Sequence, residues 1–188
     1  MTGYTDYMFL LRPDGEICNE IKNYKKFAAG LVGDYPSMHS TAHISVAKYI
    51  RGKPYIMQQA IDSLHNKLST MPVVQLQLNG FKFFIHKNDT YTIYAAIEPT
   101  FQSERWFASL SKQMSLAKGT FVPHITVART INENAFFKLW PHFKYFNFKQ
   151  HCTLSCLTVL QRETLNSNAK WAIYKEFKFK PVSAEQLA

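Results

Sequence analysis

Two eight-residue stretches of the chain are nearly identical: HISVAKYI at residues 43–50 and HITVARTI at residues 124–131. The histidine, isoleucine, valine, alanine and final isoleucine recur, serine is exchanged for threonine, and lysine is exchanged for arginine. Only Tyr49 and Thr130 differ in type. Isoleucine and valine are β-branched, so both stretches are predicted to be β-strands. The same strand is therefore expected twice, 81 residues apart, with a histidine at the head of each copy.

The repeat is longer than eight residues. Residues 4–11 read as a strand and residues 16–32 as a helix, and these precede the first copy. Residues 90–98 and 103–117 give the same order of strand and helix before the second copy. Each strand–helix–strand unit thus ends in the repeated stretch, which favours a duplicated α+β unit.

We therefore predict an α+β fold in which the two units form lobes related by an approximate two-fold axis. No linker separates the lobes, so residues 1–188 are expected to form a single domain, built around the motifs at 43–45 and 124–126. Further elements are a helix from Pro54 to Pro72, strands at 73–85 and 90–97, a short helix capped by Asn132 that stops at Pro141, and final strands at roughly 143–160 and 171–180. Asp14 and Ser103 are expected to cap the helices that follow them.

The composition narrows the class of protein. The chain has 188 residues, is 46% hydrophobic and has a net charge of +9, with the basic residues spread along its length. Such a dispersed positive charge favours an anionic ligand, most often phosphate. Three cysteines without framework spacing predict reduced thiols and a cytoplasmic protein. The first residues do not resemble a signal peptide, and no apolar stretch is long enough to span a membrane, so neither a leader nor a membrane partner is expected.

The repeated strands carry the chemistry. Side chains alternate along a strand, so His43 and Ser45 share one face while the isoleucine and valine share the core face. His124 and Thr126 are placed in the same way in the second copy. An imidazole and a hydroxyl about 6–7 Å apart can contact the same phosphate group. Two such pairs on opposite sides of one phosphorus suit general acid–base catalysis, in which one neutral imidazole takes a proton and one protonated imidazole supplies one.

Other interpretations of these residues compete with this one. An isolated H-x-[ST] triplet on a strand is usually a surface feature, and a duplication without catalysis would give a protein that only binds RNA or nucleotides in the same basic cleft. His39 and His43 have the i,i+4 spacing of a zinc pair, but the segment lacks a helical pattern and an acidic partner, so no metal is expected. An aromatic residue such as Phe83, Tyr91 or Tyr94 could stack on a nucleobase.

The paired H-x-[ST] motifs, and PHITVAR at 123–129 above all, resemble the 2H phosphoesterase superfamily and its bacterial 2′-5′ RNA ligase, or RNA 2′,3′-cyclic phosphodiesterase, branch. GFKFF at 80–84 and TIYAAI at 92–97 are similar to the strand pair that this group carries between its motifs. The first motif has serine where the group usually has threonine, which keeps the hydroxyl.

The resemblance implies a bilobal fold with antiparallel sheets around a central cleft. It implies that His43 and His124 are the catalytic acid–base pair and that Ser45 and Thr126 bind the phosphate. Arg129 is expected to serve the substrate, and Lys48, at the same offset in the first copy, is a weaker expectation. In a flat strand both would point away from the cleft, so a bend after Ala128 is required.

The activity implied is cleavage of a 2′,3′-cyclic phosphate on an RNA end or a related cyclic nucleotide, or the reverse joining of a 2′-5′ bond, without a metal or other cofactor. The expected partner is an RNA terminus or cyclic nucleotide, and the protein is taken as a monomer. As a working assignment, His124 is the base that activates water and His43 is the acid at the leaving 3′-oxygen.

Overall fold

The structure is a computed structural model that describes residues 3–117 and 122–181. It contains two four-stranded antiparallel sheets and five helices in these residues. In order across the first sheet lie β2 (Ile44–Gly52), β1 (Thr5–Leu11), β7 (Cys156–Glu163) and β8 (Ala172–Lys178), and across the second β5 (His124–Ile131), β4 (Tyr91–Ile97), β3 (Val74–Ile85) and β6 (Lys149–Leu154). The helices are α1 (Gly15–Val32), α2 (Pro54–Ser63), α3 (His65–Leu68), α4 (Phe101–Gln113) and α5 (Glu133–Tyr145).

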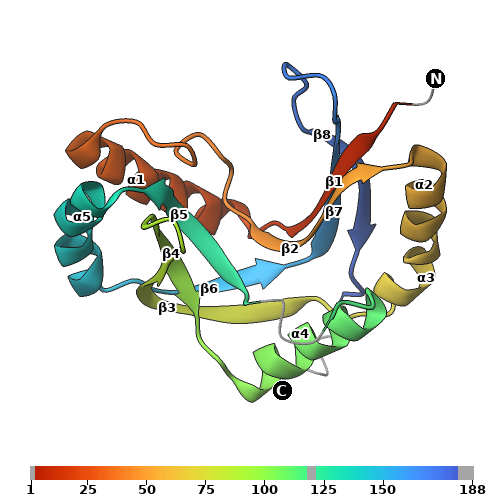
Figure 1. The fold of residues 1–188 in the computed structure, drawn as a ribbon. Helices are drawn as coiled ribbons and strands as arrows, with labels where there is room; N and C mark the ends of the chain where they lie inside the picture. The colour runs from red at the N-terminus through yellow and green to blue at the C-terminus, as the bar shows by residue number, and fades with distance from the viewer. Residues whose placement is uncertain (1–2, 118–121, 182–188) are drawn as a thin grey trace.

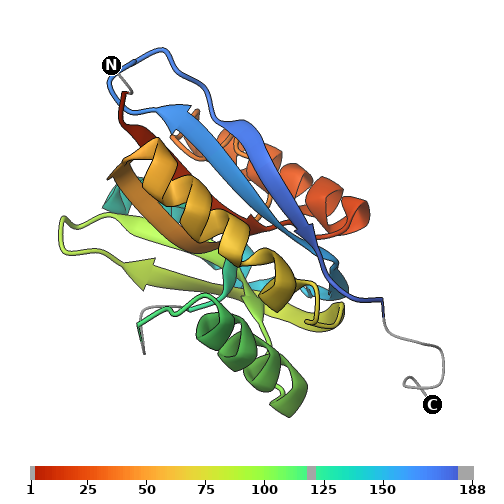
Figure 2. The same cartoon turned by 90° about the vertical axis from the view of Figure 1, so that its right-hand side faces the viewer.

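The helices cover the sheets from two sides. Helices α1 and α5 contact each other on one side of the molecule, and α2, α3 and α4 lie together on the other (Figures 1 and 2). A continuous cluster of buried apolar side chains runs through both sheets and their helices. The predicted α+β fold with antiparallel sheets is confirmed.

The two sheets are built in the same way. In each sheet the repeated strand lies at one edge, beside the first strand of its own unit: β2 beside β1, and β5 beside β4. The repeated strands β2 and β5 belong to different sheets but contact each other at the centre of the molecule (Figure 1). This matching order supports our proposal of two pseudo-symmetric lobes in a single domain.

Local signals decide where the helices begin. Asp14 and Asn132 each accept a hydrogen bond from the main-chain N–H three residues further on, at 3.1 and 2.9 Å, so both predicted caps are confirmed. The cap of α4 is different from the prediction. Thr100 is the N-cap, and Ser103 is the third helical residue that bonds back to it, forming a capping box.

The prediction that the helix after Asn132 stops at Pro141 was wrong, since α5 continues to Tyr145. A proline inside a helix removes one main-chain hydrogen bond. The buried face of α5, formed by Phe136, Leu139 and Phe143, continues across the proline and keeps the last turn packed on the core.

The single strand expected at 143–160 was also wrong. After α5 the chain forms two short strands, β6 and β7, which are separated by Ser155 and belong to different sheets. The chain therefore crosses from one sheet to the other at this residue.

The three cysteines are free thiols, and burial raises the pKa of Cys152 to about 12. Of the helices described, none has the length and apolarity needed to cross a membrane.

Candidate active site

Both repeated strands carry a β-bulge at the same position of the motif. Val46 has no partner in the pairing of β2 with β1, because Ser45 pairs with Leu10 and Ala47 with Phe9. Val127 is the unpaired residue in the pairing of β5 with β4. Each valine is the third residue after its histidine, and each is buried. A bulge bends the strand and shifts its side-chain alternation by one residue.

The bend that a role for Arg129 requires is the bulge at Val127, which precedes Ala128 instead of following it as predicted. Beyond it, Arg129 faces the same side of the sheet as Thr126, and both line one cavity. In β2 the corresponding Lys48 pairs with Met8, a lining residue, and so shares its face. Lys48 itself is exposed and does not line the cavity, so the structure gives no support to the role expected of it.

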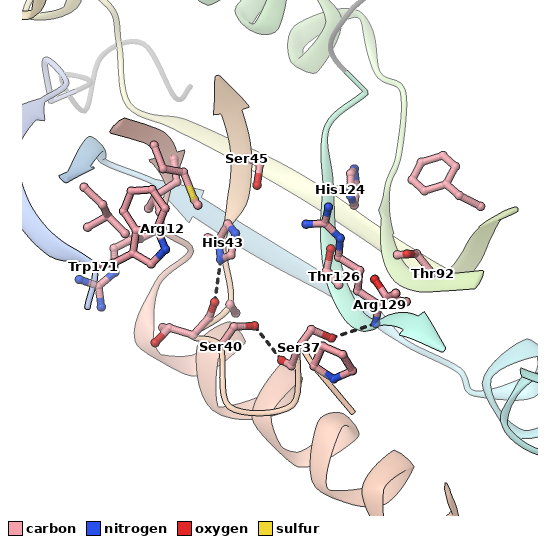
Figure 3. A pocket seen from close by; sticks show the side chains of 18 of the residues that line it. Arg12, Ser37, Ser40, His43, Ser45, Thr92, His124, Thr126, Arg129 and Trp171 are labelled. Carbon is pink, nitrogen blue, oxygen red and sulfur yellow. Dashed lines mark hydrogen bonds between the residues drawn. The ribbon is translucent and has the colours of Figure 1, made fainter. Parts of the chain in front are cut away.

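The cavity has a volume of about 960 Å³ and lies between the two sheets. Its lining comes from three sources. The first sheet and its flanking loops contribute Met8, Leu10, Arg12, His43, Ser45, Leu160 and Trp171, the second sheet and its loops contribute Phe84, His86, Thr92, His124, Thr126, Arg129 and Thr130, and the loop before β2 contributes Pro36, Ser37, Ser40, Thr41 and Ala42. The four residues predicted to carry the chemistry, His43, His124, Ser45 and Thr126, are thus brought together from opposite sheets (Figure 3).

The two histidines are held by equivalent hydrogen bonds. Nδ1 of His43 lies 2.8 Å from the carbonyl oxygen of Thr41, and Nδ1 of His124 lies 2.7 Å from that of Val122. A carbonyl oxygen only accepts, so Nδ1 carries the proton in both rings. This leaves Nε2 of each ring as the nitrogen that can take or give a proton at a ligand.

The surroundings of both rings favour the neutral form. Burial lowers the pKa of His43, the bond to Thr41 opposes this, and the positive charges of Lys25, His124 and Arg129 lower it further. Burial also lowers the pKa of His124, against the bond to Val122, and Arg129 adds to the lowering. The repulsion between the rings and the charge of Arg129 act on both, so Lys25 is the positive group that acts on His43 and not on His124.

The loop before β2 is tied to the second motif. The Tyr35 hydroxyl bonds to the carbonyl oxygens of Lys25, at 3.1 Å, and Val127, at 3.3 Å. The main-chain N–H of Arg129 donates to the Ser37 hydroxyl at 2.9 Å (Figure 3). No role of this loop in the site was predicted from the sequence. Its run of hydroxyl residues directly before a strand-initial histidine is the signal that would have indicated a site.

An apolar and basic wall lies on the far side of His43 from His124, where Figure 3 shows Arg12 and Trp171. Met8, Leu10 and Leu160 complete this wall. The guanidinium of Arg162 lies 4.6 Å from the ring centre of Trp171, a cation–π contact. Arg162 is itself held by the buried carboxylate of Asp6, through bonds of 3.1 and 3.0 Å. This wall was not predicted from the sequence, because only folding brings the loop before β8 beside β7 and β1.

The aromatic residue of β3 that faces the cavity is Phe84, not Phe83. Uninterrupted alternation from Leu78 would place Phe84 on the core face and Phe83 opposite. A register shift at Gly80, whose φ of 67° is a left-handed conformation, reverses this order. Phe83 consequently packs on α5, while Phe84 lines the cavity with its ring centre 5.1 Å from that of His124.

Tyr91 and Tyr94, the other aromatic residues considered for stacking, differ in which side of the sheet they face. Tyr91 stacks on Phe136 of α5, so it faces away from the cavity. Tyr94 is buried beneath Phe84, at a ring-centre distance of 4.3 Å.

Two further histidines differ in their relation to the cavity. His39 is exposed and does not line it. His86, for which no role was predicted, does line it and bonds to Thr92 at 2.8 Å. Within residues 3–117 and 122–181 there is no group of three metal-binding side chains.

The fold and the paired motifs are those of the 2H phosphoesterases. The family model described as the 2′-5′ RNA ligase superfamily matches residues 13–166. The chain belongs to this superfamily. A comparison with curated proteins found no match.

Solved structures share the fold at low sequence identity. E. coli LigT complexed with phosphate is 12% identical with a TM-score of 0.64, and the alignment covers 95% of this chain and 99% of LigT. LigT complexed with 3′-AMP gives the same identity and TM-score over 94% and 98%. TT0787 of Thermus thermophilus is 12% identical with a TM-score of 0.63 over 92% and 97%.

Proposed function

We propose that the chain is a metal-independent phosphoesterase that opens the 2′,3′-cyclic phosphate of an RNA end or a related cyclic nucleotide. The observation that carries this proposal is the pair of histidines, each with Nδ1 held by a carbonyl oxygen two residues before it and each lining the same cavity from a different sheet. Membership of the superfamily and the phosphate and 3′-AMP held by LigT support it.

The reaction needs one neutral and one protonated imidazole. The neutral ring takes a proton from water through Nε2, and the water oxygen forms a bond to phosphorus. The bond from phosphorus to the 3′-oxygen breaks, and the protonated ring gives its proton to that oxygen. The product carries a 2′-phosphate and a 3′-hydroxyl. With the 5′-hydroxyl of a second RNA bound in place of water, the same groups would form a 2′-5′ bond or, in reverse, cleave one.

The hydroxyls of Ser45 and Thr126 are suited to donate to the non-bridging phosphate oxygens. Arg129 lines the same cavity and supplies a permanent positive charge. Negative charge that develops on the phosphoryl oxygens is stabilised by donors and charges fixed in advance. These groups come from the protein itself, so the proposed reaction requires no cofactor.

The working assignment from the sequence has His124 as the base and His43 as the acid, but the charges around the two rings favour the reverse. The two rings repel each other equally when charged, and Arg129 lowers the pKa of both, so the distinguishing charge is Lys25, which lowers the pKa of His43 and not that of His124. Of two adjacent rings that share one proton, the one with more positive neighbours stays neutral. We therefore assign His43 as the base and His124 as the acid.

A nucleoside attached to the phosphate fits the wall beyond His43. A cavity of about 960 Å³ is much larger than a phosphate group, and the wall offers the ring of Trp171 together with apolar side chains and Arg12. Bases stack on aromatic side chains with little regard to sequence. We infer that Trp171 is the residue on which the nucleobase stacks.

The direct test is incubation of the full-length chain with 2′,3′-cyclic AMP in the presence of EDTA. The expected product is 2′-AMP, formed at the same rate with and without the chelator. Binding of the nucleotide without turnover would favour the alternative, an RNA- or nucleotide-binding protein without activity. Turnover that EDTA abolishes would indicate a metal-dependent phosphoesterase instead.

A further inference from the structure

A buried lysine lies beneath the loop that borders the cavity. Lys25 of α1 is only 3% exposed, although lysine is among the residues least often buried. Its ammonium donates to the carbonyl oxygens of Ser37 and Ser40, at 2.9 and 2.7 Å, and to the Ser40 hydroxyl at 2.8 Å. All three of its N–H groups therefore have acceptors, and all of these acceptors belong to the same short segment.

The acceptors around this ammonium are neutral oxygens. In the part of the chain that the structure describes, ion pairs join Arg162 to Asp6 and Lys175 to Asp62, and neither involves Lys25. Burial lowers the pKa of Lys25 to about 8, so the group is still mostly charged at neutral pH. A buried charge held only by neutral oxygens costs folding free energy, which makes a purely structural role a poor explanation.

The segment that Lys25 holds controls both motifs. Ser40 precedes Thr41, whose carbonyl oxygen fixes the ring of His43. Ser37 accepts the main-chain N–H of Arg129, in the second motif. One ammonium thus secures the acceptor that orients the first histidine and the contact that joins the loop to β5.

Lys25 also acts on His43 through its charge. It is among the groups that lower the pKa of His43, together with His124 and Arg129 of β5, and it is not among those that affect His124. Arg12 and His86 line the same cavity from the other walls. Lys25 differs from all of these in being unable to contact a ligand, since its three donors are already used.

We propose that Lys25 is a positioning residue of the active site: it fixes the segment from Ser37 to Thr41 that orients His43, and it places a buried positive charge behind that segment. The assignment of a base rests on the function proposed above. The effect of Lys25 on the His43 ring does not, because it is measurable without turnover.

The test compares Lys25→Met with Lys25→Arg and with Lys26→Met, which removes a charge from the neighbouring, exposed lysine of the same helix. The ring proton of His43 is titrated by NMR in each protein. In Lys25→Met it is expected to titrate at higher pH than in the wild type, while His124 changes less. Lys25→Arg and Lys26→Met should leave the titration of His43 close to that of the wild type. In the same series kcat/KM for 2′,3′-cyclic AMP should fall about tenfold in Lys25→Met alone.

A folded Lys25→Met protein in which His43 titrates as in the wild type would overturn the proposal. If that variant does not fold, the wild-type protein provides the measurement. The His43 ring signal should then show a second, smaller inflection near pH 8, where Lys25 loses its proton. The absence of that inflection would equally overturn the proposal. A normal inflection in a protein that lacks phosphodiesterase activity would refute the proposed function and leave the link between Lys25 and His43 intact.

Discussion

The hydroxyl of Tyr35 donates to the main-chain carbonyl oxygen of Val127, at 3.3 Å, across 92 residues of sequence. Val127 is the bulged residue of β5, which has no partner in the pairing with β4. The tyrosine thus joins the loop that precedes one repeated strand to the bend of the other. It is buried, and burial raises the pKa of its phenol, so the hydroxyl stays protonated and can donate.

Tyr35→Phe removes this donor and keeps the ring. We expect the free energy of unfolding to fall by about 1 to 2 kcal/mol, because the buried carbonyl oxygens of Val127 and Lys25 lose the donor that they share. Denaturant unfolding measures the change. Tyr55→Phe, at an exposed tyrosine of α2, is the control. Equal stability of Tyr35→Phe and the wild type would mean that the bulge does not depend on this bond.

His43→Ala and His124→Ala should each lower kcat by about 10²- to 10⁴-fold, because each removes one partner of the proton transfer. The double variant should be little worse than either single one, since the two rings act as a unit. His39→Ala, at the exposed histidine of the same loop, is the matched control and should retain activity. A variant of either motif histidine that alters only KM would contradict the acid–base roles.

The dependence of kcat/KM on pH should be bell-shaped, with its centre on the acid side of 6.5. Burial and positive neighbours lower the pKa of both histidines from that ordinary value. The rate should fall at low pH as the base gains a proton and at higher pH as the acid loses its proton. The kcat profile should lie at higher pH, because a bound phosphate anion favours the protonated rings. A kcat/KM profile centred above about pH 7 would contradict the cause given for the shifts.

Trp171→Ala should raise KM for 2′,3′-cyclic AMP about tenfold with a smaller effect on kcat, since stacking on a base stabilises substrate and transition state alike. Trp171→Phe should restore most of the loss. The 1,2-cyclic phosphate of glycerol, which has no base, tests the assignment directly. Its KM should be the same in the wild type and in Trp171→Ala, and a matching increase there would assign Trp171 to phosphate binding or to the fold.

Asp6→Asn should lower the free energy of unfolding at neutral pH by about 2 kcal/mol, because Arg162 loses its charged acceptor. Burial alone would raise the pKa of Asp6, but hydrogen bonds from Thr164, the Arg51 main chain and Arg162, with the charge of Arg162, together lower it. Because the pKa of Asp6 is lowered in the folded protein, its ionised carboxylate stabilises the fold fully at pH values above the ordinary pKa of 3.8. This stabilisation is lost as the pH falls through the lowered pKa. The difference between wild type and variant should therefore shrink in strong acid, and a constant difference from neutral pH to about pH 2 would contradict this account.

The part of the candidate site that could be predicted from the sequence is the part that lies in the two repeated stretches, 43–50 and 124–131. The heads of the two stretches locate His43 and His124, and strict alternation assigns Ser45 and Thr126 to the same faces as these histidines. Alternation fails beyond the bulged valine of each strand, because a bulge depends on how a strand pairs with its neighbour. The face of Arg129 could for this reason be stated only on condition of a bend.

Residues that reach the site through tertiary structure were not predictable in this way. Phe84 is on the cavity face because Gly80 shifts the register of β3. Trp171 is distant in sequence from both motifs, and Lys25 is distant from the second. Nothing in their local sequence distinguishes them from an ordinary loop tryptophan and an ordinary helical lysine. The roles proposed for them depend on the cavity that Trp171 lines and on the bonds of Lys25 to the 37–40 segment, which only the folded molecule brings about.

Within the described residues, no ladder of main-chain hydrogen bonds joins β2 to β5, since the two strands are edges of separate sheets. The gap between the two histidine rings is therefore set by the side chains packed between those sheets and by the hydrogen bonds of Tyr35 and Ser37, which join the loop before β2 to β5. A larger or smaller side chain at one of these buried positions would increase or decrease the distance between the rings of His43 and His124 without changing any residue that lines the cavity. Laboratory evolution of this protein would accordingly find substitutions that change the rate among the buried side chains between the sheets as well as among the residues that line the cavity.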